Sequence, residues 1–320
     1  MSINLNGWII LDKPLGITSA HAVAKVKRLL HPDKIGHAGT LDPLASGVLP
    51  LALGEATKTV AYMMDATKSY AFTVTWGQER ATDDSAGEVL FESANRPKKE
   101  DIVSILQQFI GNISQTPPNY SAIKLDGKRA YDLARAGQTI EIKAREVTVK
   151  SLEIVENLSL RGGEADVAIQ TGLLRYAHND EQQLTTDFIC HCGKGTYIRS
   201  LARDMGRLLG CYGYISSLRR LQVGKFNETH AISLENLVEM VHKGEVDFLQ
   251  PVESALDDIL AWDINSTQAT RLRQGQTVEI PDINSGNSDS ILVLARDNGK
   301  AMAICKWEAG VIKPLRVFNL

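Results

Sequence analysis

The chain has 320 residues, of which 43% are hydrophobic and 23% are charged, as is typical of a globular protein with a sizeable core. This length suggests two domains, or one large domain with an appendage. The sequence contains no uninterrupted apolar run that could cross a bilayer. Its first residues lack the basic and apolar regions of a signal peptide. We therefore expect a cytoplasmic protein with no membrane segment.

The charge is unevenly distributed along the chain. The formal net charge is −3, which argues against a nucleic-acid partner. Residues 231–290 contain 3 Lys/Arg and 11 Asp/Glu, a local net charge of −8, so the rest of the chain carries +5. Because affinity for phosphate depends on local potential, a basic body with an acidic segment can still bind nucleic acid. Charge alone gives this interpretation only weak support.

The four cysteines indicate reduced thiols and not a disulfide framework, given the length of the chain. They are Cys190, Cys192, Cys211 and Cys305. Cys190 and Cys192 are one residue apart, which places both on the same face of a strand. No second ligand pair follows at zinc-finger spacing. We expect buried structural thiols and no metal.

In chain order, the first expected element is a short buried strand at residues 8–11. A helix should follow, capped by Thr18 or Ser19 and apolar on one face. Residues 31–54 are rich in Gly and Pro, which predicts a loop without regular structure.

Further elements follow from periodicity. Helices are expected at 55–65 and 99–110, and alternation predicts a strand at 70–76. Asp126-Gly127 is a strong hairpin-turn signal. Additional strands are predicted near 145–156, 165–170 and 186–192, and the polar stretch 173–183 reads as a surface loop.

The apolar spacing after Thr196 predicts a helix that Thr196 caps. Its expected stripe is Ile198, Leu201, Ala202, Met205, Leu208 and Leu209. Another helix is expected at 233–242. From residue 251 the pattern changes to one helix near 266–274 and short strands around 276–280, 290–296, 300–306 and 312–318. This pattern is typical of a small β-barrel-like module.

The segment with the most chemical information is residues 37–50, His-Ala-Gly-Thr-Leu-Asp-Pro-Leu-Ala-Ser-Gly-Val-Leu-Pro. It places one carboxylate, Asp42, between Gly39 and Gly47. Pro43 biases Asp42 towards an extended conformation, which can project the side chain from the backbone. The alternative is a tight turn in which Asp42 only caps local amides, and composition alone favours that alternative.

The order of residues in this segment closely resembles the catalytic loop of TruB-type pseudouridine synthases. Three further segments resemble motifs of the same family in the same order. These are residues 12–19, residues 117–124 continuing through 127–131, and residues 194–201 followed by Leu218-Arg219-Arg220-Leu221. Together the motifs cover most of residues 8–222, whereas the region after 251 resembles the family's PUA-like appendage only loosely.

The resemblance implies an α+β fold with a mixed, mainly antiparallel sheet flanked by helices and an active-site cleft across its centre. It implies a catalytic domain at 1–250 with an RNA-gripping insertion at 118–146, and a small β-barrel-like PUA-type RNA-binding domain at 251–320. The implied reaction is isomerisation of uridine 55 in the tRNA T loop to pseudouridine, by a monomer that contacts the T arm. No metal, nucleotide or redox cofactor is implied.

The resemblance also implies roles for individual residues. Asp42 matches the catalytic carboxylate, which is expected to be buried and therefore to need a guanidinium partner to stay ionised. Arg199 is the expected partner. Arg203 and Arg207 follow it at helical spacing and are interpreted as a solvated basic stripe. Tyr70 matches a tyrosine that stacks on uracil and can move a proton, although alone it reads as a core residue.

Other matched positions are expected to bind the RNA. His37, Tyr197 and Leu218 match residues around the target nucleotide, and Lys13 and Lys58 match basic positions near the active site. In the insertion, the basic residues include Lys124 and Arg129, and an ordinary basic hairpin is the alternative interpretation.

Two other functions remain open from the sequence. The first is a guide-RNA-dependent pseudouridine synthase, whose relatives typically lack the complete insertion at 118–146. The second is a non-catalytic tRNA-binding or tRNA-folding protein, against which the retention of Asp42, Tyr70 and Arg199 argues.

Overall fold

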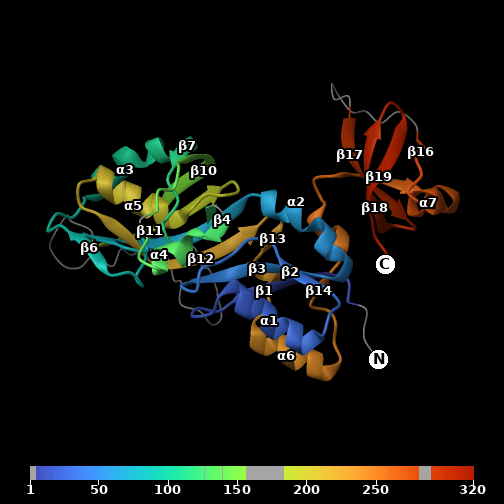
Figure 1. The fold of residues 1–320 in the computed structure, drawn as a ribbon, viewed down its shortest axis with the longest axis horizontal. Coiled ribbons are helices and arrows are strands. Elements are labelled where there is room, and N and C mark those ends of the chain that lie inside the picture. Colours follow the sequence, from blue (N-terminus) through green and yellow to red (C-terminus); the bar gives the residue numbers. More distant parts are fainter. Residues whose placement is uncertain (1–4, 126, 139, 156–183, 281–289) are drawn as a thin grey trace.

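The computed structural model describes residues 5–125, 127–138, 140–155, 184–280 and 290–320. The main body is built on a ten-stranded sheet (Figure 1). Its strands are β1 (Gly7–Lys13), β2 (Ile35–His37), β3 (Ala45–Leu53), β4 (Lys68–Trp76), β7 (Gly111–Gln115), β10 (Arg145–Val155), β11 (Thr185–Cys192), β12 (Gly213–Val223), β13 (Phe226–Asn227) and β14 (Leu249–Gln250).

The strand order is β14-β1-β3-β12-β4-β11-β10-β7, with β2 beside β3 and β13 beside β12. The contact between β3 and β12 is parallel, and the other pairings described in this sheet are antiparallel. β3 and β12 are the third and fourth strands of this path, so their ends lie at the middle of the sheet. The predicted mainly antiparallel α+β fold is confirmed.

The main helices are α1 (Ser19–Leu30), α2 (Val60–Asp65), α3 (Lys99–Leu106), α5 (Ile198–Leu208) and α6 (Leu234–Lys243). Short 3₁₀ turns lie at Gly54–Thr59, Gln107–Phe109, Glu228–His230 and Val252–Ala255. The helices predicted at 55–65, 99–110 and 233–242 are therefore confirmed, the first two with a 3₁₀ part. Thr18 caps α1, because its side chain accepts a hydrogen bond from the His21 amide.

The helices α1, α3, α5 and α6 share one core with a single face of the sheet. Alternate residues of β4, among them Phe72, Val74 and Trp76, point into that core. On the other face, Trp8 and Val48 pack with α2 and with Ile304 of the C-terminal sheet. The main body and the C-terminal sheet are therefore joined by a shared apolar core.

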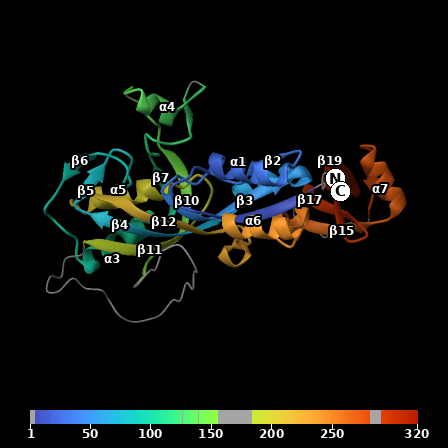
Figure 2. The ribbon, with the colours of Figure 1, turned by 90° about the horizontal axis from the view of Figure 1, so that it is seen from below.

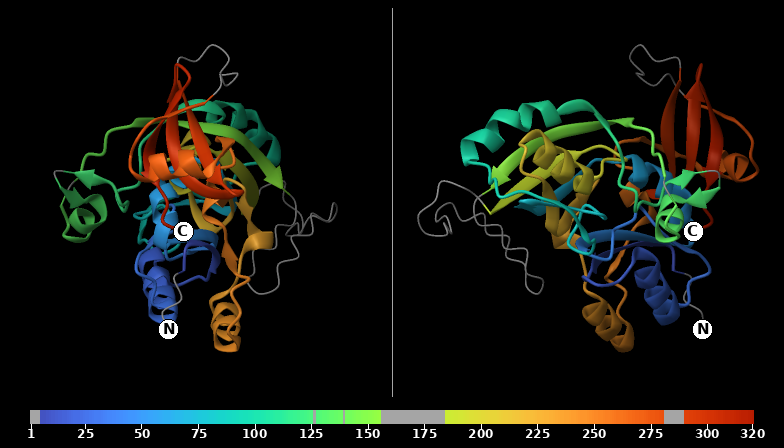
Figure 3. Two further views of the ribbon diagram at one scale, coloured as in Figure 1. Left: turned by 90° about the vertical axis from the view of Figure 1, so that its right-hand side faces the viewer. Right: turned by 60° about the vertical axis from the view of Figure 1, so that its left-hand side comes forward.

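The C-terminal sheet is a separate, curled half-barrel (Figures 1 and 3). It contains β15 (Leu260–Ile264), β16 (Val278–Glu279), β17 (Ser290–Asp297), β18 (Lys300–Glu308) and β19 (Val311–Val317), with α7 (Ser266–Arg273) beside it. The strand order is β15-β17-β18-β19-β16. The predicted helix and four strands are confirmed, whereas β15 was missed by the sequence analysis.

Two small hairpins stand outside these sheets. β5 (Gln78–Arg80) pairs with β6 (Val89–Glu92), and β8 (Lys124–Leu125) pairs with β9 (Lys128–Arg129). The pairing of Leu125 with Lys128 confirms the predicted hairpin turn. α4 (Ala130–Arg135) follows this second hairpin, and Figures 2 and 3 show that both project from the main body.

Two predicted elements are wrong. Residues 31–54 were expected to be a loop, but they contain β2 and the nine-residue strand β3, in which every residue is buried. A strand covered on both faces is apolar throughout and does not alternate, and Pro50 hid it further because proline is rare in central strands. Thr196 does not cap α5, whose N-cap is Tyr197. The strand expected at 165–170 and the loop at 173–183 lie outside the described residues.

Candidate active site

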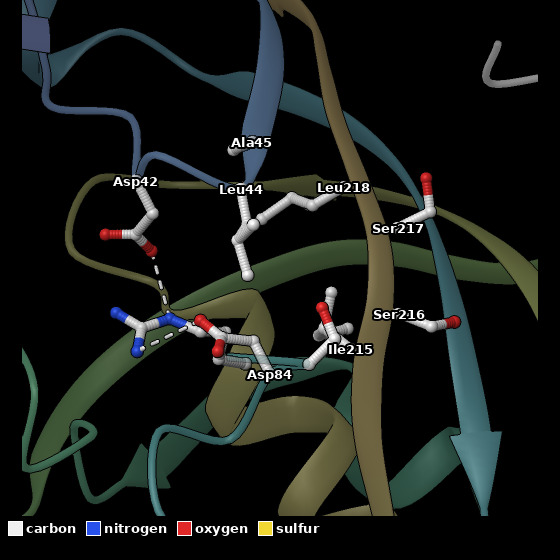
Figure 4. A pocket seen from close by; sticks show the side chains of 10 residues that line it. Asp42, Leu44, Ala45, Asp84, Ile215, Ser216, Ser217 and Leu218 are labelled. Carbon is white, nitrogen blue, oxygen red and sulfur yellow. Dashed lines mark ion pairs between the residues drawn. The ribbon is translucent and has the colours of Figure 1, made fainter. Parts of the chain in front are cut away.

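A pocket opens where the first residue of β3 lies beside the middle of β12 (Figure 4). It is lined by Asp42, Leu44, Ala45, Asp84, Ser85, Arg199, Ile215, Ser216, Ser217 and Leu218. These residues come from four segments that are far apart in the sequence. Because β3 and β12 lie at the middle of the sheet, this pocket lies where the active-site cleft is expected.

Asp42 lies in the loop that leads into β3, and the loop is held from both sides. On one side Ser19, the first residue of α1, accepts a hydrogen bond from the Leu41 amide at 2.8 Å and donates to the Leu41 carbonyl at 3.0 Å. On the other side Arg220 donates from Nε to Val48 O at 2.7 Å and from Nη2 to Gly39 O at 3.2 Å. Neighbours on both sides therefore fix the backbone around the carboxylate.

The side chain of Asp42 is 38% exposed. The expectation of a buried carboxylate is therefore wrong. The loop directs the side chain to the pocket, where it borders solvent and can meet a substrate.

Arg199 brings its guanidinium to this carboxylate from the first turn of α5. Its Nε lies 3.0 Å from Asp42 Oδ2. A dashed line in Figure 4 marks this ion pair. Its Nη1 donates to Thr82 O at 2.7 Å, and its Nη2 donates to Tyr120 O at 2.9 Å. The side chain of Arg199 is only 5% exposed. The predicted pairing of Arg199 with Asp42 is confirmed.

Asp84 places a second carboxylate in the pocket, which the sequence analysis missed. Its Oδ2 lies 3.8 Å from Arg199 Nη1. Its Oδ1 accepts hydrogen bonds from the Thr82 hydroxyl and from the Ala86 amide. The adjacent pair Asp83-Asp84 after a predicted strand was the signal that could have identified this loop.

The interpretation of Arg203 as part of a solvated stripe is wrong. Its side chain is 9% exposed, and Nη1 lies 2.9 Å from Asp83 Oδ2. Arg207 is 54% exposed, but it forms a bidentate pair with the buried Glu79 at 2.6 and 2.8 Å. Glu79 of β5 and Asp83 of the loop that follows it cover this face of α5, which helical spacing alone could not reveal.

Tyr70 lies on β4, opposite Arg220 of β12 and Cys190 of β11. It is half-buried and packs against the main core. Burial raises the pKa of the Tyr70 hydroxyl, and the nearby Arg220 guanidinium acts in the opposite direction. Arg220 therefore touches the Asp42 loop and lies beside Tyr70.

Lys13 is fully buried, and its ammonium group donates to Pro14 O at 2.9 Å and to Ile17 O at 2.8 Å. Burial lowers the pKa of Lys13 to about 8, and the Asp42 charge opposes this shift. Lys13 therefore supports the turn beside the Asp42 loop from within. A group so completely buried does not reach an RNA phosphate in this conformation.

Lys58 is not near the pocket, so its expected position is wrong. It follows the far end of β3, whose nine residues span roughly 25–30 Å. Its ammonium group pairs with Glu55 at 2.6 Å and donates to Val317 O at 2.8 Å. Lys58 therefore contacts the C-terminal sheet.

The remaining predicted residues are only partly brought together. Leu218 lines the pocket. The backbone of Tyr197 exchanges two hydrogen bonds with the Gln115 side chain, at 2.8 and 3.1 Å, and Arg145 lies over its ring. His37 ends β2 and does not line the pocket, and burial lowers its pKa. Lys124 and Arg129 pair through their backbones in the projecting hairpin.

The four cysteines are free and buried, which confirms their predicted state. Within the described ranges, no cluster of three or more His, Cys, Asp or Glu is arranged to hold a metal ion. In the same part of the chain, no helix is long and apolar enough to cross a membrane.

Comparison with known proteins gives matches along nearly the whole chain. Residues 27–198 match the N-terminal domain of the TruB family pseudouridylate synthases, and residues 199–257 match the tRNA pseudouridylate synthase B C-terminal domain. A protein named tRNA pseudouridine synthase B from Nitrobacter winogradskyi is 46% identical, and the match covers 99% of this chain and 84% of that protein. A protein of the same name from Caulobacter sp. (strain K31) is 43% identical, with 99% and 97% covered.

Solved structures share the fold. A chain from a Cbf5-Nop10-Gar1 complex is 26% identical with a TM-score of 0.69, and the match covers 97% of this chain and 84% of that chain. A chain from an H/ACA RNP bound to a substrate RNA containing 2'-deoxyuridine has the same TM-score at 24% identity, with 98% and 85% covered.

Proposed function

Because this chain belongs to the TruB family of pseudouridylate synthases, we propose that it is a tRNA pseudouridine synthase that isomerises uridine 55 of the T loop. It acts as a stand-alone monomer and uses Asp42 as its nucleophile. The observation that carries this proposal is the ion pair of 3.0 Å between Arg199 and the partly exposed Asp42, at a pocket in the middle of the sheet.

The reaction breaks the bond between ribose C1′ and uracil N1, turns the base, and joins C1′ to C5. The C5 proton is lost and N1 gains one, so the base is isomerised with no net redox change. Asp42 adds as a nucleophile, to the base or to ribose C1′, and is released when the new bond has formed. Arg199, whose Nε lies 3.0 Å from Asp42 Oδ2, orients the carboxylate before and after this step.

Pocket residues can hold a flat base in this position. Leu44 and Leu218 provide apolar contacts close to the carboxylate (Figure 4). We assign to Tyr70 the stacking on uracil and the transfer of the C5 proton. Burial raises the pKa of its hydroxyl and so disfavours the phenolate that would accept this proton, whereas the Arg220 guanidinium beside it favours the phenolate.

A T-loop uridine is stacked, and turning it out of the loop costs a few kcal/mol. Contacts elsewhere on the RNA must offset this cost. The projecting hairpin and α4 carry exposed basic residues, among them Lys128 and Arg135, on a chain whose charge outside 231–290 is +5. We assign to residues 118–146 the grip on the T arm, and to residues 251–320 a second, PUA-like RNA contact.

A guide-RNA-dependent synthase is the alternative that shares this fold. The likeness to chains from H/ACA complexes, at 24–26% identity, is a likeness of fold. The sequence relatives at 43–46% identity, and the hairpin with α4 between residues 118 and 146, support a stand-alone enzyme.

The test uses purified protein and an unmodified tRNA transcript without any added RNA, with pseudouridine mapped at each position. The wild type should convert the T-loop uridine alone. Asp42→Asn should bind the transcript with unchanged affinity and convert none of it. A wild-type protein that binds tRNA but converts no uridine until a guide RNA is added would overturn the proposal in favour of the guide-dependent enzyme.

A further inference from the structure

We propose that Arg203 is a positioning residue for the isomerisation: it fixes the two backbone segments that hold Arg199, and through Arg199 it sets the Asp42 carboxylate. This inference rests on the proposed function. It adds a residue, one helical turn from the pocket, to which neither the family motifs nor the pocket lining assigns a role.

All three nitrogen groups of the Arg203 side chain have partners. Nη1 donates to Asp83 Oδ2 at 2.9 Å, and Nη2 donates to Thr116 O at 2.8 Å. Nε donates to Asp204 Oδ1 at 2.9 Å. The planar guanidinium therefore joins α5 to two loops in one fixed geometry, which a lysine could not reproduce.

Arg199 binds the same two segments one turn earlier on α5. Its terminal nitrogens donate to Thr82 O and Tyr120 O, next to Asp83 in one segment and four residues after Thr116 in the other. The two arginines are four residues apart and lie on one face of the helix. Arg199 and Arg203 thus form two levels of one clamp.

The Ser200 hydroxyl strengthens the second level, because it also donates to Thr116 O at 2.9 Å. The carbonyls that orient Arg199 belong to segments 82–85 and 116–120, and the second level holds both. A shift of these carbonyls would move Nε of Arg199 away from Asp42. A displacement of about 1 Å in a catalytic group can reduce a rate by about 100-fold.

The clamp also links the pocket to the part of the chain assigned to RNA binding. Segment 116–120 overlaps the start of the insertion at 118–146, and Tyr120 packs edge-on against Tyr131 of α4. A force that RNA exerts on the insertion would therefore reach the carbonyl of Tyr120, which Arg199 binds. Arg203 resists that movement at Thr116.

The pairing of Arg203 with Asp83 is buried on both sides, with side-chain exposures of 9% and 8%. Burial raises the pKa of Asp83 to about 6, although Arg203 and Arg199 act against this shift. Asp83 has a φ of 58°, a conformation that asparagine also tolerates. Asp83→Asn therefore removes the charge from the pair while keeping the backbone and an acceptor oxygen.

The experiment compares Arg203→Met, Arg203→Lys and Asp83→Asn with Arg207→Met as the matched control. Arg207 lies one turn further along the same helix face and also forms an ion pair with a buried carboxylate, but that carboxylate is Glu79 in β5, outside both segments. Each variant is measured by single-turnover pseudouridine formation, by its Kd for the tRNA, by its Tm, and by the ¹⁵N resonance of Arg199 Nε.

Arg203→Met should lower the single-turnover rate at least tenfold while the Kd changes less than threefold, and it should shift the Arg199 Nε resonance. Arg203→Lys and Asp83→Asn should show smaller changes in the same direction. If Arg203→Met fails to fold, these two variants test whether Arg203 positions Arg199. Arg207→Met should lower the Tm but keep the rate within twofold and leave the resonance unmoved.

The inference is overturned if the Arg203 variants match Arg207→Met in rate at equal Tm, or if the loss lies entirely in the Kd. If the wild type makes no pseudouridine, the proposed function is wrong, and the Arg199 Nε resonance alone tests the role of Arg203. A shift of this resonance in the Arg203 variants but not in Arg207→Met supports the clamp. An unmoved resonance in the Arg203 variants overturns the clamp.

Discussion

Arg199 approaches Asp42 with its Nε, 3.0 Å from Oδ2, while both of its terminal nitrogens donate to backbone carbonyls. The Nε–H is not aligned with Oδ2, and Nε has no hydrogen-bond partner among the described residues. The contact is therefore an ion pair without hydrogen-bond geometry. Because Thr82 and Tyr120 hold the guanidinium, Arg199 keeps its place when Asp42 bonds to a substrate, as expected of a preorganised site.

Arg199→Lys should lower turnover at least about 100-fold while leaving tRNA affinity nearly unchanged. A lysine retains the charge but cannot contact Asp42, Thr82 and Tyr120 together. Steady-state kinetics with a saturating transcript would measure the effect on kcat, and Arg207→Lys is the control on the same helix. A loss seen only in KM would mean that Arg199 binds RNA and does not orient the carboxylate.

Asp84→Asn should have a smaller effect, about tenfold on kcat. The substitution removes the negative charge 3.8 Å from Arg199 Nη1 but keeps an oxygen that can accept from Thr82 and Ala86. Arg199 would keep both carbonyl contacts and lose only one of its two facing carboxylates. Measured beside Asp42→Asn, an equally complete loss would show that Asp84 takes part in the chemistry directly.

The sequence was sufficient to identify the pairing of Arg199 with Asp42, because each residue lies in a distinctive motif of the family that the chain resembles. It was not sufficient for the residues that hold the pair. Arg220 occurs in a recognised motif, yet its role depends on the carbonyls of Gly39 and Val48, which carry no sequence signal. Backbone acceptors are identical at every residue, so only the fold shows which ones a side chain reaches.

The incorrect predictions have related causes. β3 reads as a loop because Gly47 and Pro50 are unusual in strands. Pro50 is tolerated because it falls between the residues of β3 that pair with β12, 45–47, and those that pair with β2, 51–53. Arg203 reads as solvated because helical spacing predicts on which face of the helix a residue lies, but not which other segments pack against that face. Lys58 was placed near Asp42, but β3 separates the two residues by its whole length.

Gly47→Ala should destabilise the protein by about 3 kcal/mol or more. Gly47 has a φ of 98°, and an added Cβ would lie 2.3 Å from the Arg220 carbonyl oxygen. The parallel contact of β3 with β12 at this point, Gly47 against Arg220, would have to open. Urea unfolding measures the effect. Gly36→Ala is the control, because nothing lies within 4 Å of its added Cβ, and equal losses in both variants would refute the explanation.

Lys13→Met should change how stability depends on pH. Burial lowers the pKa of Lys13 from 10.5 to about 8 in the folded chain. Between pH 8 and 10.5 the unfolded chain therefore binds more protons, and this residue's contribution to stability rises with pH. From pH 7 to pH 10 the wild type should gain about 2–3 kcal/mol relative to Lys13→Met.

Urea unfolding of both proteins at the two pH values measures this difference. Lys68, whose pKa burial also lowers to about 8, is present in both and cancels. A constant difference between the two proteins would show that Lys13 titrates normally when folded, and therefore that water reaches it beside the Asp42 loop.

Lys128→Ala should weaken tRNA binding and reduce its salt dependence while leaving the chemical step intact. Lys128 is exposed in the hairpin that projects from the body (Figure 2). Its ammonium group can therefore contact an RNA phosphate without first leaving a buried position. Losing one phosphate contact lowers the slope of log K against log[salt] by about 1. Filter binding at 50–300 mM salt measures the slope, and single-turnover kinetics at saturating enzyme measures the rate.

Lys243→Ala, at the end of α6 in the acidic part of the chain, is the control and should change neither quantity. An unchanged slope for Lys128→Ala would mean that the hairpin does not grip the backbone of the RNA, and a slower single-turnover rate at saturation would place Lys128 in the chemistry and not in binding.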